Sequence, residues 1–189
     1  RYKHAFVALR EEGRFAEEIR QTGASVVTMK CKNRIAMIGE LRNYFRSRKV
    51  DIVHTHNTFP HLYGTLAARW AKVPIVVNTR HGQRAGHGWK SRFLFRMASR
   101  WVNRIVAVSD DAANLCVQAD GLSKSKVTRI WNGIDASQFS FRGPSADPIA
   151  VTVGRLVPEK DLATLIRAIS LASGSIPNLR LKIVGEGPS

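Results

Sequence analysis

Two short apolar runs near the end of the chain stop at glycine and are followed by residues that could hold a phosphate. The run 149–154 ends at Gly154, and Arg155 and Lys160 then stand five residues apart beside the expected start of a helix. Arginine offers a planar fork of donors to phosphate oxygens, lysine offers a mobile charge, and a helix N-terminus adds oriented N–H groups. This segment therefore predicts a diphosphate-binding loop, with a solvated pair of cations as the alternative. The second run, 179–185, has the same glycine-rich exit.

Three histidines follow or end two earlier apolar runs. His54 and His56 close one run, and His81 stands beside Gly82 after the next. Glycine lets a backbone approach a ligand closely, which favours a site role for His81. His54 by itself is more typical of a strand-end histidine with a satisfied hydrogen bond. A zinc site is disfavoured, because no carboxylate or cysteine completes a familiar ligand spacing.

Further polar residues stand at the ends of two later runs. Ser109 follows the run 104–108, and Asn132 and Gly133 follow the run 127–131. A serine before a helical pattern is typical of a helix N-cap, and an asparagine–glycine pair is typical of a tight turn. Because ligands of open α/β sheets bind at the carboxyl ends of strands, a site role is the second interpretation of these residues.

The elements that must position these residues alternate between apolar runs and amphipathic stretches. Such alternation is typical of parallel sheets covered by helices, so we expect an α/β fold. In the helical stretches, apolar residues recur three and four apart on one face, as in Ile35, Ile38, Leu41 and Phe45. The expected strands are 4–9, 24–29, 50–54, 74–79, 104–108, 127–131, 149–154 and 179–185.

The segment 143–148 is the strongest turn and linker signal, because it reads Gly-Pro-Ser-Ala-Asp-Pro. We place a domain boundary there, between one α/β domain over 1–142 and the β-α-β start of a second over 149–189. Two strands and one helix bury too little apolar surface to stand alone, so we expect the second domain to be incomplete.

The balance of charge is unusual: 30 Lys+Arg against 14 Asp+Glu leave a formal net charge of +16. An anionic partner is implied, whether nucleic acid, an anionic membrane surface or a phosphorylated substrate. No stretch reaches the roughly 18 consecutive apolar residues that a membrane-spanning helix needs. The two cysteines, Cys31 and Cys116, stand far apart, which favours a reduced cytoplasmic chain over a disulfide scaffold.

The segment 89–104 predicts one helix with a basic stripe. Arg92, Arg96, Arg100 and Arg104 recur every four residues. The adjacent apolar stripe consists of Phe93, Met97 and Trp101. Such a helix could rest on anionic lipid through its four arginines. The alternative is an ordinary packing helix with a solvated basic face.

Six motifs in this order resemble glycosyltransferase family 4, a retaining family also called glycosyl transferases group 1, whose members have the GT-B fold. The resemblance runs from about His4 to Ser189. Its motifs are 51–56, 79–82, 106–109, 132–135 with Phe139, 153–156 with Lys160, and 183–188. It implies a nearly complete Rossmann-like, acceptor-side domain over 1–142 and the beginning of a Rossmann-like, nucleotide-sugar-binding domain over 149–189.

The resemblance also implies a reaction. In the family a sugar moves from a nucleotide-sugar donor to a glycan or lipid-linked acceptor in the cleft between two domains, with retention of anomeric configuration. The position matching His81 is the expected catalytic residue near the transferred sugar. Those matching Arg155 and Lys160 neutralise the donor diphosphate. Because cations placed where charge develops lower the barrier, neither a metal nor another cofactor is expected.

The same resemblance implies roles for the other candidate residues. Gly154 would allow close phosphate approach, Asn132, Gly133, Gly185, Glu186 and Gly187 would face the nucleoside or donor, and His54, His56 and Ser109 would lie on the acceptor or sugar side.

Parts of the family pattern fall outside this sequence. A Gly-rich loop after the family's first strand should precede Arg1, and two glutamates spaced Glu-x7-Glu should follow Ser189. We therefore expect an internal fragment that is inactive alone. Residue 161 is Asp where many members have Gly, a change that a helix N-terminus tolerates.

Two other functions stay open. A GT-B epimerase acting on a UDP-sugar would share the fold and the diphosphate grip. A basic nucleic-acid-binding protein would account for the charge, but no nucleic-acid-binding motif is recognised and the basic residues are not gathered with aromatic stacking platforms. The family resemblance implies a cytoplasmic location, with peripheral contact at the inner face of the cytoplasmic membrane, in assembly of envelope polysaccharide such as lipopolysaccharide.

Overall fold

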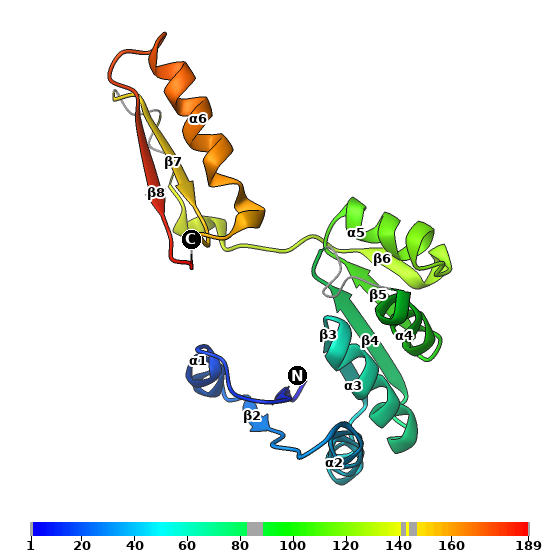
Figure 1. The fold of residues 1–189 in the computed structure, drawn as a ribbon. Helices are drawn as coiled ribbons and strands as arrows, with labels where there is room; N and C mark the ends of the chain where they lie inside the picture. Colours follow the sequence, from blue (N-terminus) through cyan, green and yellow to red (C-terminus); the bar gives the residue numbers. More distant parts are fainter. Residues whose placement is uncertain (1, 83–88, 141–142, 144–146, 189) are drawn as a thin grey trace. The chain divides into compact units, whose positions relative to one another are not determined.

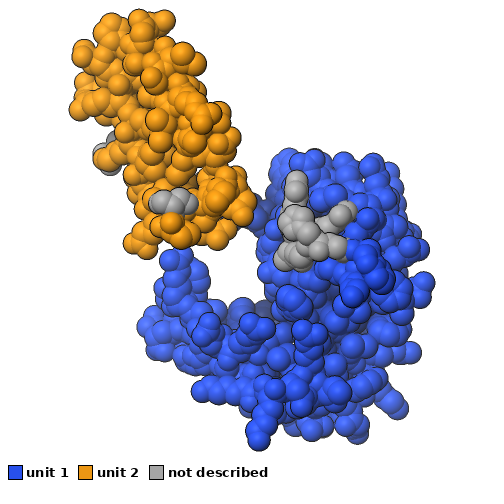
Figure 2. All heavy atoms as spheres, in the orientation of Figure 1, with its two compact units in different colours: residues 1–133 blue, residues 134–189 orange. Residues whose placement is uncertain are grey.

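The structure is a computed structural model and describes residues 2–82, 89–140, 143 and 147–188. Figure 1 shows strands and helices alternating along the chain, and Figure 2 colours its two compact units, Arg1–Gly133 and Ile134–Ser189. Of the expected linker 143–148, residues 144–146 lie outside the described residues. That boundary stays a prediction.

Unit 1 contains two parallel sheets. β1 (Ala5–Ala8) pairs with β2 (Ser25–Thr28), and a four-stranded sheet has the order β3-β4-β5-β6. Its strands are β3 (Ile52–His56), β4 (Ile75–Arg80), β5 (Arg104–Ala107) and β6 (Val127–Arg129), each paired in parallel with its neighbour. All six strands overlap expected apolar runs, although β3 begins and ends two residues later than the expected strand 50–54, and the α/β fold with parallel sheets is confirmed.

Helices connect these strands. They are α1 (Ala16–Gln21), α2 (Arg34–Ser47), α3 (Thr58–Ala71), α4 (Trp89–Ser99) and α5 (Asp110–Asn114), followed by a π-helical turn, η1 (Leu115–Ala119), and a 3₁₀ turn, η2 (Lys124–Lys126). Asn33 starts α2 as an N-cap, because its side chain accepts a hydrogen bond from Ala36 N at 2.9 Å. Leu41 and Phe45 of α2 are buried as expected, whereas Ile35 in the first turn is 81% exposed and does not share their face.

The core of unit 1 lies where α2 and α3 pack against the sheets. Leu41 and Phe45 of α2 meet Val53 of β3 and the fully buried Ala67 and Ala68 of α3. Side chains alternate across β3, so Val53 and Thr55 are buried, while Ile52, His54 and His56 lie on the more exposed opposite face, where neighbouring groups still cover part of each imidazole. This alternation places both histidines of β3 on one side of the sheet.

The predicted helix over 89–104 is wrong beyond Ser99, where α4 (Trp89–Ser99) ends. Arg100 lies in the turn that follows, and Arg104 is the first residue of β5, so the four arginines do not form one stripe. The side chain of Asn103 accepts a hydrogen bond from Val76 N at 2.8 Å, and Val102 is buried. These contacts with the core and with β4 end the helix.

The apolar face of α4 also differs from the prediction. Phe95, Ala98 and Ser99 are the buried residues of this helix, whereas Phe93 and Trp101 are 56% and 42% exposed. Helix α4 is therefore an ordinary packing helix, but it packs through Phe95, Ala98 and Ser99 and not through the predicted apolar stripe. No helix in the described ranges has the length and apolarity to cross a membrane.

Unit 2 contains one parallel strand pair and one long helix. β7 (Ile149–Val153) pairs with β8 (Arg180–Val184), and α6 (Leu162–Ser173) connects them. The 3₁₀ turns η3 (Ala136–Gln138) and η4 (Pro158–Lys160) precede β7 and α6. None of the residues of α6, all of which the structure describes, is buried.

Candidate active site

Three imidazoles meet at the carboxyl ends of β3 and β4. His54 Nε2 lies 2.7 Å from Thr79 Oγ1, and His56 Nδ1 lies 2.9 Å from His81 Nε2. The ring centroids of His54 and His56 are 4.3 Å apart, and those of His56 and His81 are 5.2 Å apart. β3 and β4 pair with His56 opposite Thr79, which brings the residue after β4 next to the end of β3. The structure therefore brings together three of the predicted site residues.

The surroundings of His54 and His56 favour the uncharged form of these two rings. Partial burial lowers the pKa of His54, and the His81 ring lowers it further. Partial burial likewise lowers the pKa of His56, helped by the rings of His54 and His81. His54 and His56 are therefore neutral near pH 7. A neutral imidazole offers one donor and one acceptor nitrogen, the pair needed to bind a hydroxyl or to pass a proton.

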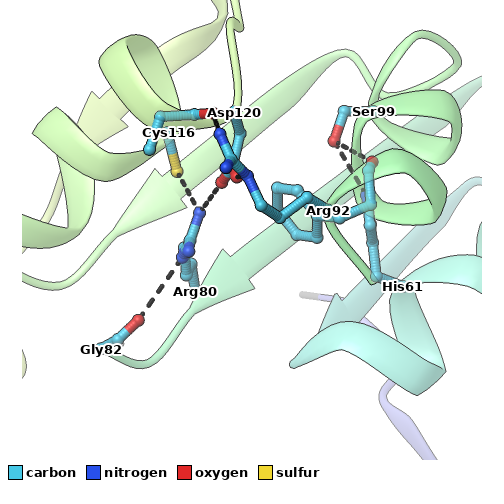
Figure 3. A network of polar contacts seen from close by, with 9 residues as sticks. His61, Arg80, Gly82, Arg92, Ser99, Cys116 and Asp120 are labelled. Carbon is cyan, nitrogen blue, oxygen red and sulfur yellow. Dashed lines mark hydrogen bonds and ion pairs between the residues drawn. The ribbon is translucent and has the colours of Figure 1, made fainter. Parts of the chain in front are cut away.

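Directly before His81, a buried ion pair holds Arg80 in place (Figure 3). The guanidinium of Arg80 pairs with the carboxylate of Asp120, whose side chain is 2% exposed, and donates to Cys116 Sγ at 3.4 Å. Arg80 Nε donates to the Gly82 carbonyl at 3.4 Å. Burying a charge is costly unless it is paired and hydrogen-bonded, and here both conditions are met. Arg80 and, through its bond to the Gly82 carbonyl, the residue after His81 are thereby tied to η1 and to Asp120 directly after it.

A second arginine completes this network. Arg92 of α4 has its Nε 3.8 Å from Asp120 Oδ1 and donates to the carbonyl of Ala119. The Arg80 guanidinium also lies over the Phe95 ring, 5.1 Å from its centroid. One carboxylate therefore faces two arginines, and the local charge is positive.

A small cavity opens beside His81. Its volume is ≈ 40 Å³, and its lining includes Asn57, Thr58, Asn78 and Arg80. Asn57 has φ 63° and ψ −177°, a strained conformation for a residue other than glycine. Oδ1 of the fully buried Asn78 has no hydrogen-bond partner among the described residues. The cavity exceeds the roughly 10–15 Å³ that a water needs, and it offers amide and hydroxyl groups to a small polar ligand.

Ser109, Asn132 and Gly133 lie after the next two strands. Ser109 is the N-cap of α5, because its Oγ accepts a hydrogen bond from Ala112 N at 3.1 Å. The helix-cap interpretation of Ser109 is thereby confirmed. Asn132 and Gly133 follow β6 at the end of unit 1 and are exposed. Their donor-facing roles, and an acceptor-side role for Ser109, stay predictions.

In unit 2, the loops that leave β7 and β8 lie against each other. Leu156 N donates to the carbonyl of Glu186 at 2.9 Å. A Cβ on Gly185 would come within 1.8 Å of the Gly154 carbonyl oxygen, and one on Gly187 within 2.0 Å of that of Leu156. Only glycine fits at both positions, which explains the glycine-rich exit of β8.

Arg155 and Lys160 are exposed on this loop and the turn after it. The Cε of Lys160 is 3.8 Å from where a Cβ would stand on Gly154, so the lysine stem lies along the loop. Asp161 is the N-cap of α6 and has φ 46°, a left-handed conformation that glycine adopts readily. This explains how Asp and Gly can exchange at position 161. The diphosphate role of Gly154, Arg155 and Lys160 stays a prediction.

Asp120 and Arg92 were not among the predicted site residues. The signal for them was Arg80, a charged residue at the end of a buried apolar strand, which needs a carboxylate nearby. Nothing in the sequence indicated which carboxylate it would be. Within the described ranges, no group of three or more His, Cys, Asp or Glu is arranged to hold a metal ion.

The parallel sheets and the helices that connect them have the Rossmann-like architecture of the GT-B fold. The crystal structure of HepE from Anabaena in complex with UDP has a TM-score of 0.83 with this chain. That likeness, at 14% identity, covers 98% of this chain and 61% of HepE. It shows the fold.

The family follows from the sequence itself. The sequence profile of glycosyltransferase family 4 matches residues 1–138, so the chain belongs to that family. A curated relative is the UDP-Gal:alpha-D-GlcNAc-diphosphoundecaprenol alpha-1,3-galactosyltransferase of Escherichia coli, 27% identical over 183 residues. The match covers 83% of this chain and 47% of the relative. The chain therefore spans about half the length of that enzyme.

The fold is shared with epimerases, more distantly. A crystal structure of UDP-N-acetylglucosamine 2-epimerase has a TM-score of 0.57 and 14% identity, over 93% of this chain and 54% of that chain. The TM-score with HepE, 0.83, is higher.

Proposed function

We propose that this chain is part of a retaining glycosyltransferase that moves a sugar from a nucleotide-sugar donor to a glycan or lipid-linked acceptor. One observation carries the proposal: in a member of family 4, His81 stands at the carboxyl end of β4, hydrogen-bonded to His56 and flanked by the buried Arg80. Carboxyl ends of parallel strands are where ligands of such folds bind. The neutral His56 ring, hydrogen-bonded to His81, is suited to contact sugar hydroxyls.

In this reaction His81 assists at the transferred sugar. Arg155 and Lys160 neutralise the nucleoside diphosphate as it leaves, and Gly154 lets the backbone approach it. The leaving group is an anion, so cations held where that charge develops lower the barrier without a metal. The loop bearing Arg155 is braced by Gly185 and Gly187, which supports its use as a fixed phosphate grip.

The name of the E. coli relative supports a proposal for the acceptor. The E. coli enzyme's name describes a diphosphoundecaprenol-linked acceptor, a sugar on a lipid carrier. We infer the same class of acceptor here, and with it a cytoplasmic enzyme that works at the inner face of the membrane in polysaccharide assembly. The 189-residue chain alone is expected to be inactive.

Donor binding is the first test, and it is made on the protein expressed from the whole reading frame that contains this chain. We expect UDP binding, measured by calorimetry, to weaken at least about tenfold on Arg155→Ala or Lys160→Ala, since each removes a charge-assisted phosphate contact. Arg167→Ala on the exposed side of α6 is the matched control and should leave the affinity unchanged. Equal affinity for wild type and the Arg155 variant would contradict the diphosphate role.

Transfer is tested on the protein expressed from the whole reading frame that contains this chain. A labelled UDP-, GDP- or ADP-sugar should give a glycosylated product whose anomeric configuration, measured by NMR, matches the donor. His81→Ala should lower kcat while leaving UDP affinity intact. A donor that is epimerised, with no sugar transferred, would replace the proposal by the epimerase function.

A further inference from the structure

Positive charge is concentrated at one edge of the four-stranded sheet. Unit 1 contains 24 Lys+Arg and 9 Asp+Glu, so it carries 24 − 9 = +15 of the chain's +16. The connections that lead into β3, β4, β5 and β6 hold nine of these cations and one acidic residue, Asp51. They are the segments 46–51, 69–74, 100–104 and 124–126. Because the four strands are parallel neighbours, these connections gather where the strands begin, and we call this surface the basic edge.

Four cations of the basic edge line one open hollow. Arg69, Arg100, Arg104 and Lys126 surround a space of ≈ 540 Å³ together with Trp101. Lys126 Nζ donates to the Arg100 carbonyl at 3.0 Å, which fixes the wall of the hollow. Among the described residues, no carboxylate forms an ion pair with any of these four cations. The hollow therefore presents uncompensated positive charge.

The helix dipole explains only part of this charge. A cation in the last turn of a helix is stabilised by the partial negative charge there, which accounts for Arg46 in α2 and Arg69 in α3. Lys49, Lys72 and Arg104 lie beyond the last turns of these helices. Mutual repulsion among so many cations is unfavourable, and an anionic partner would relieve it.

Two tryptophans indicate which anionic partner fits. Trp70, in the last turn of α3, is 58% exposed, and Trp101, beside the hollow, is 42% exposed. Tryptophan has an apolar body and a polar N–H, and it is enriched where membrane proteins meet the headgroup layer. Lysine and arginine near such a surface are attracted by anionic lipids.

We propose that the basic edge is the surface by which unit 1 docks on an anionic lipid bilayer. This rests on the proposed function, which sets the enzyme at the membrane, and it names the surface that makes the contact; vesicle binding requires no sugar transfer, so either proposal can fail without the other. It also differs from the stripe predicted from the sequence. Arg92 is held by Asp120 away from this edge, and only Arg100 and Arg104 of the four predicted arginines belong to it.

The test compares two variants of the full chain with equal charge. In the edge variant, glutamine replaces Arg48, Arg69, Arg100 and Arg104; in the control variant, it replaces Arg10, Arg14, Lys30 and Lys32, which follow β1 and β2. All eight side chains are exposed, so both variants should keep the wild-type circular dichroism spectrum. On vesicles of phosphatidylcholine with phosphatidylglycerol, we expect the edge variant to bind at least about tenfold more weakly than wild type, and the control variant less than about twofold.

The outcomes separate docking from mere net charge. Equal losses in the two variants, or no binding by the wild type, would overturn the proposal. So would tighter binding to a random DNA duplex than to the vesicles at the same salt concentration, which would make nucleic acid the partner of this edge.

A second measurement locates the contact. Brominated lipids quench tryptophan at the headgroup boundary, so they should quench the wild-type fluorescence. The Trp70→Phe, Trp101→Phe double variant keeps Trp89 and Trp131 and should lose most of that quenching. Quenching that persists in this folded variant would place the contact elsewhere and overturn the assignment of the edge.

Discussion

His56 Nδ1 and His81 Nε2 lie 2.9 Å apart, so one proton joins the end of β3 to the residue that follows β4. Partial burial is the main cause that lowers the pKa of His56, and the neighbouring rings of His54 and then His81 lower it further. We expect His54→Gln to raise the pKa of His56, but not fully to about 6.5, because the burial remains. NMR titration of the ring protons measures this directly.

The control for that titration is His4→Gln, at an exposed position just before β1. It should leave the pKa of His56 where it is in the wild type. An unchanged pKa in the His54 variant would mean that the three rings do not interact as their geometry indicates.

Breaking the Arg80–Asp120 pair should be far more costly than breaking an exposed pair. Asp120→Asn leaves the Arg80 charge buried without its carboxylate, and we expect a loss of about 3–5 kcal/mol in the free energy of unfolding. Asp110→Asn removes the carboxylate that Arg129 contacts at 2.7 Å on the surface, and should cost about 0–1 kcal/mol. Urea denaturation measures both values.

A double variant separates the lost charge partner from lost packing. Arg80→Met with Asp120→Leu removes both charges, so it should be more stable than Asp120→Asn alone. If the double variant is the less stable of the two, the network stabilises unit 1 through its hydrogen bonds rather than by pairing a buried charge.

His61 predicts how the stability of unit 1 depends on pH. This residue is fully buried between α3 and α4, with its Nε2 3.0 Å from Ser99 Oγ. Ser99 Oγ donates to the Phe95 carbonyl at 2.7 Å, so it accepts from the Nε2–H of a neutral ring. Nδ1 then has no partner among the described residues, and burial lowers the pKa of His61 to about 4.

The direction of this pH dependence follows from comparing His61 in the unfolded and the folded chain. Below about pH 6.5 the unfolded chain takes up a proton at His61, while the folded chain does not until about pH 4. Stability is therefore lost as the pH falls from about 6.5 to about 4, by an amount of about 3 kcal/mol. Thermal denaturation of wild type and His61→Leu across this range should show a smaller pH dependence in the variant. Parallel curves would assign the acid sensitivity to other groups.

Glycine substitutions should separate close approach from ordinary packing in unit 2. Gly185→Ala and Gly187→Ala place a methyl group within 1.8 and 2.0 Å of backbone carbonyl oxygens, so the loop that bears Arg155 must shift. Gly174→Ala meets the nearest oxygen at 3.5 Å and should be tolerated. We expect amide chemical shifts around Arg155 to change strongly in the first two variants and little in the third. A Gly185→Ala spectrum that matches the wild type at Arg155 would contradict the close approach.

Much of the fold could be predicted because its signals are local. Each strand is an apolar run that ends at polar residues, and the carboxyl ends of neighbouring parallel strands share an edge, which places His56 and His81 together. The end of α4 could not be predicted, because arginines continue at helical spacing beyond Ser99. The bond from Val76 N to the Asn103 side chain, across 27 residues, decides the boundary instead. The partner of Arg80 is likewise 40 residues away.

The length of β4 sets the distance between the basic edge and the imidazole cluster. Its six residues run from the basic edge, at Ile75, to Arg80, just before the imidazole cluster, and at about 3.3 Å per residue they separate the two by roughly 20 Å. A chain docked on a bilayer by the basic edge would therefore hold His81 well above the headgroups. The acceptor hydroxyl of a lipid-linked sugar or glycan would then have to stand at about that height above the headgroups. The length of one strand would then act as a ruler that selects acceptors by how far they project from the membrane.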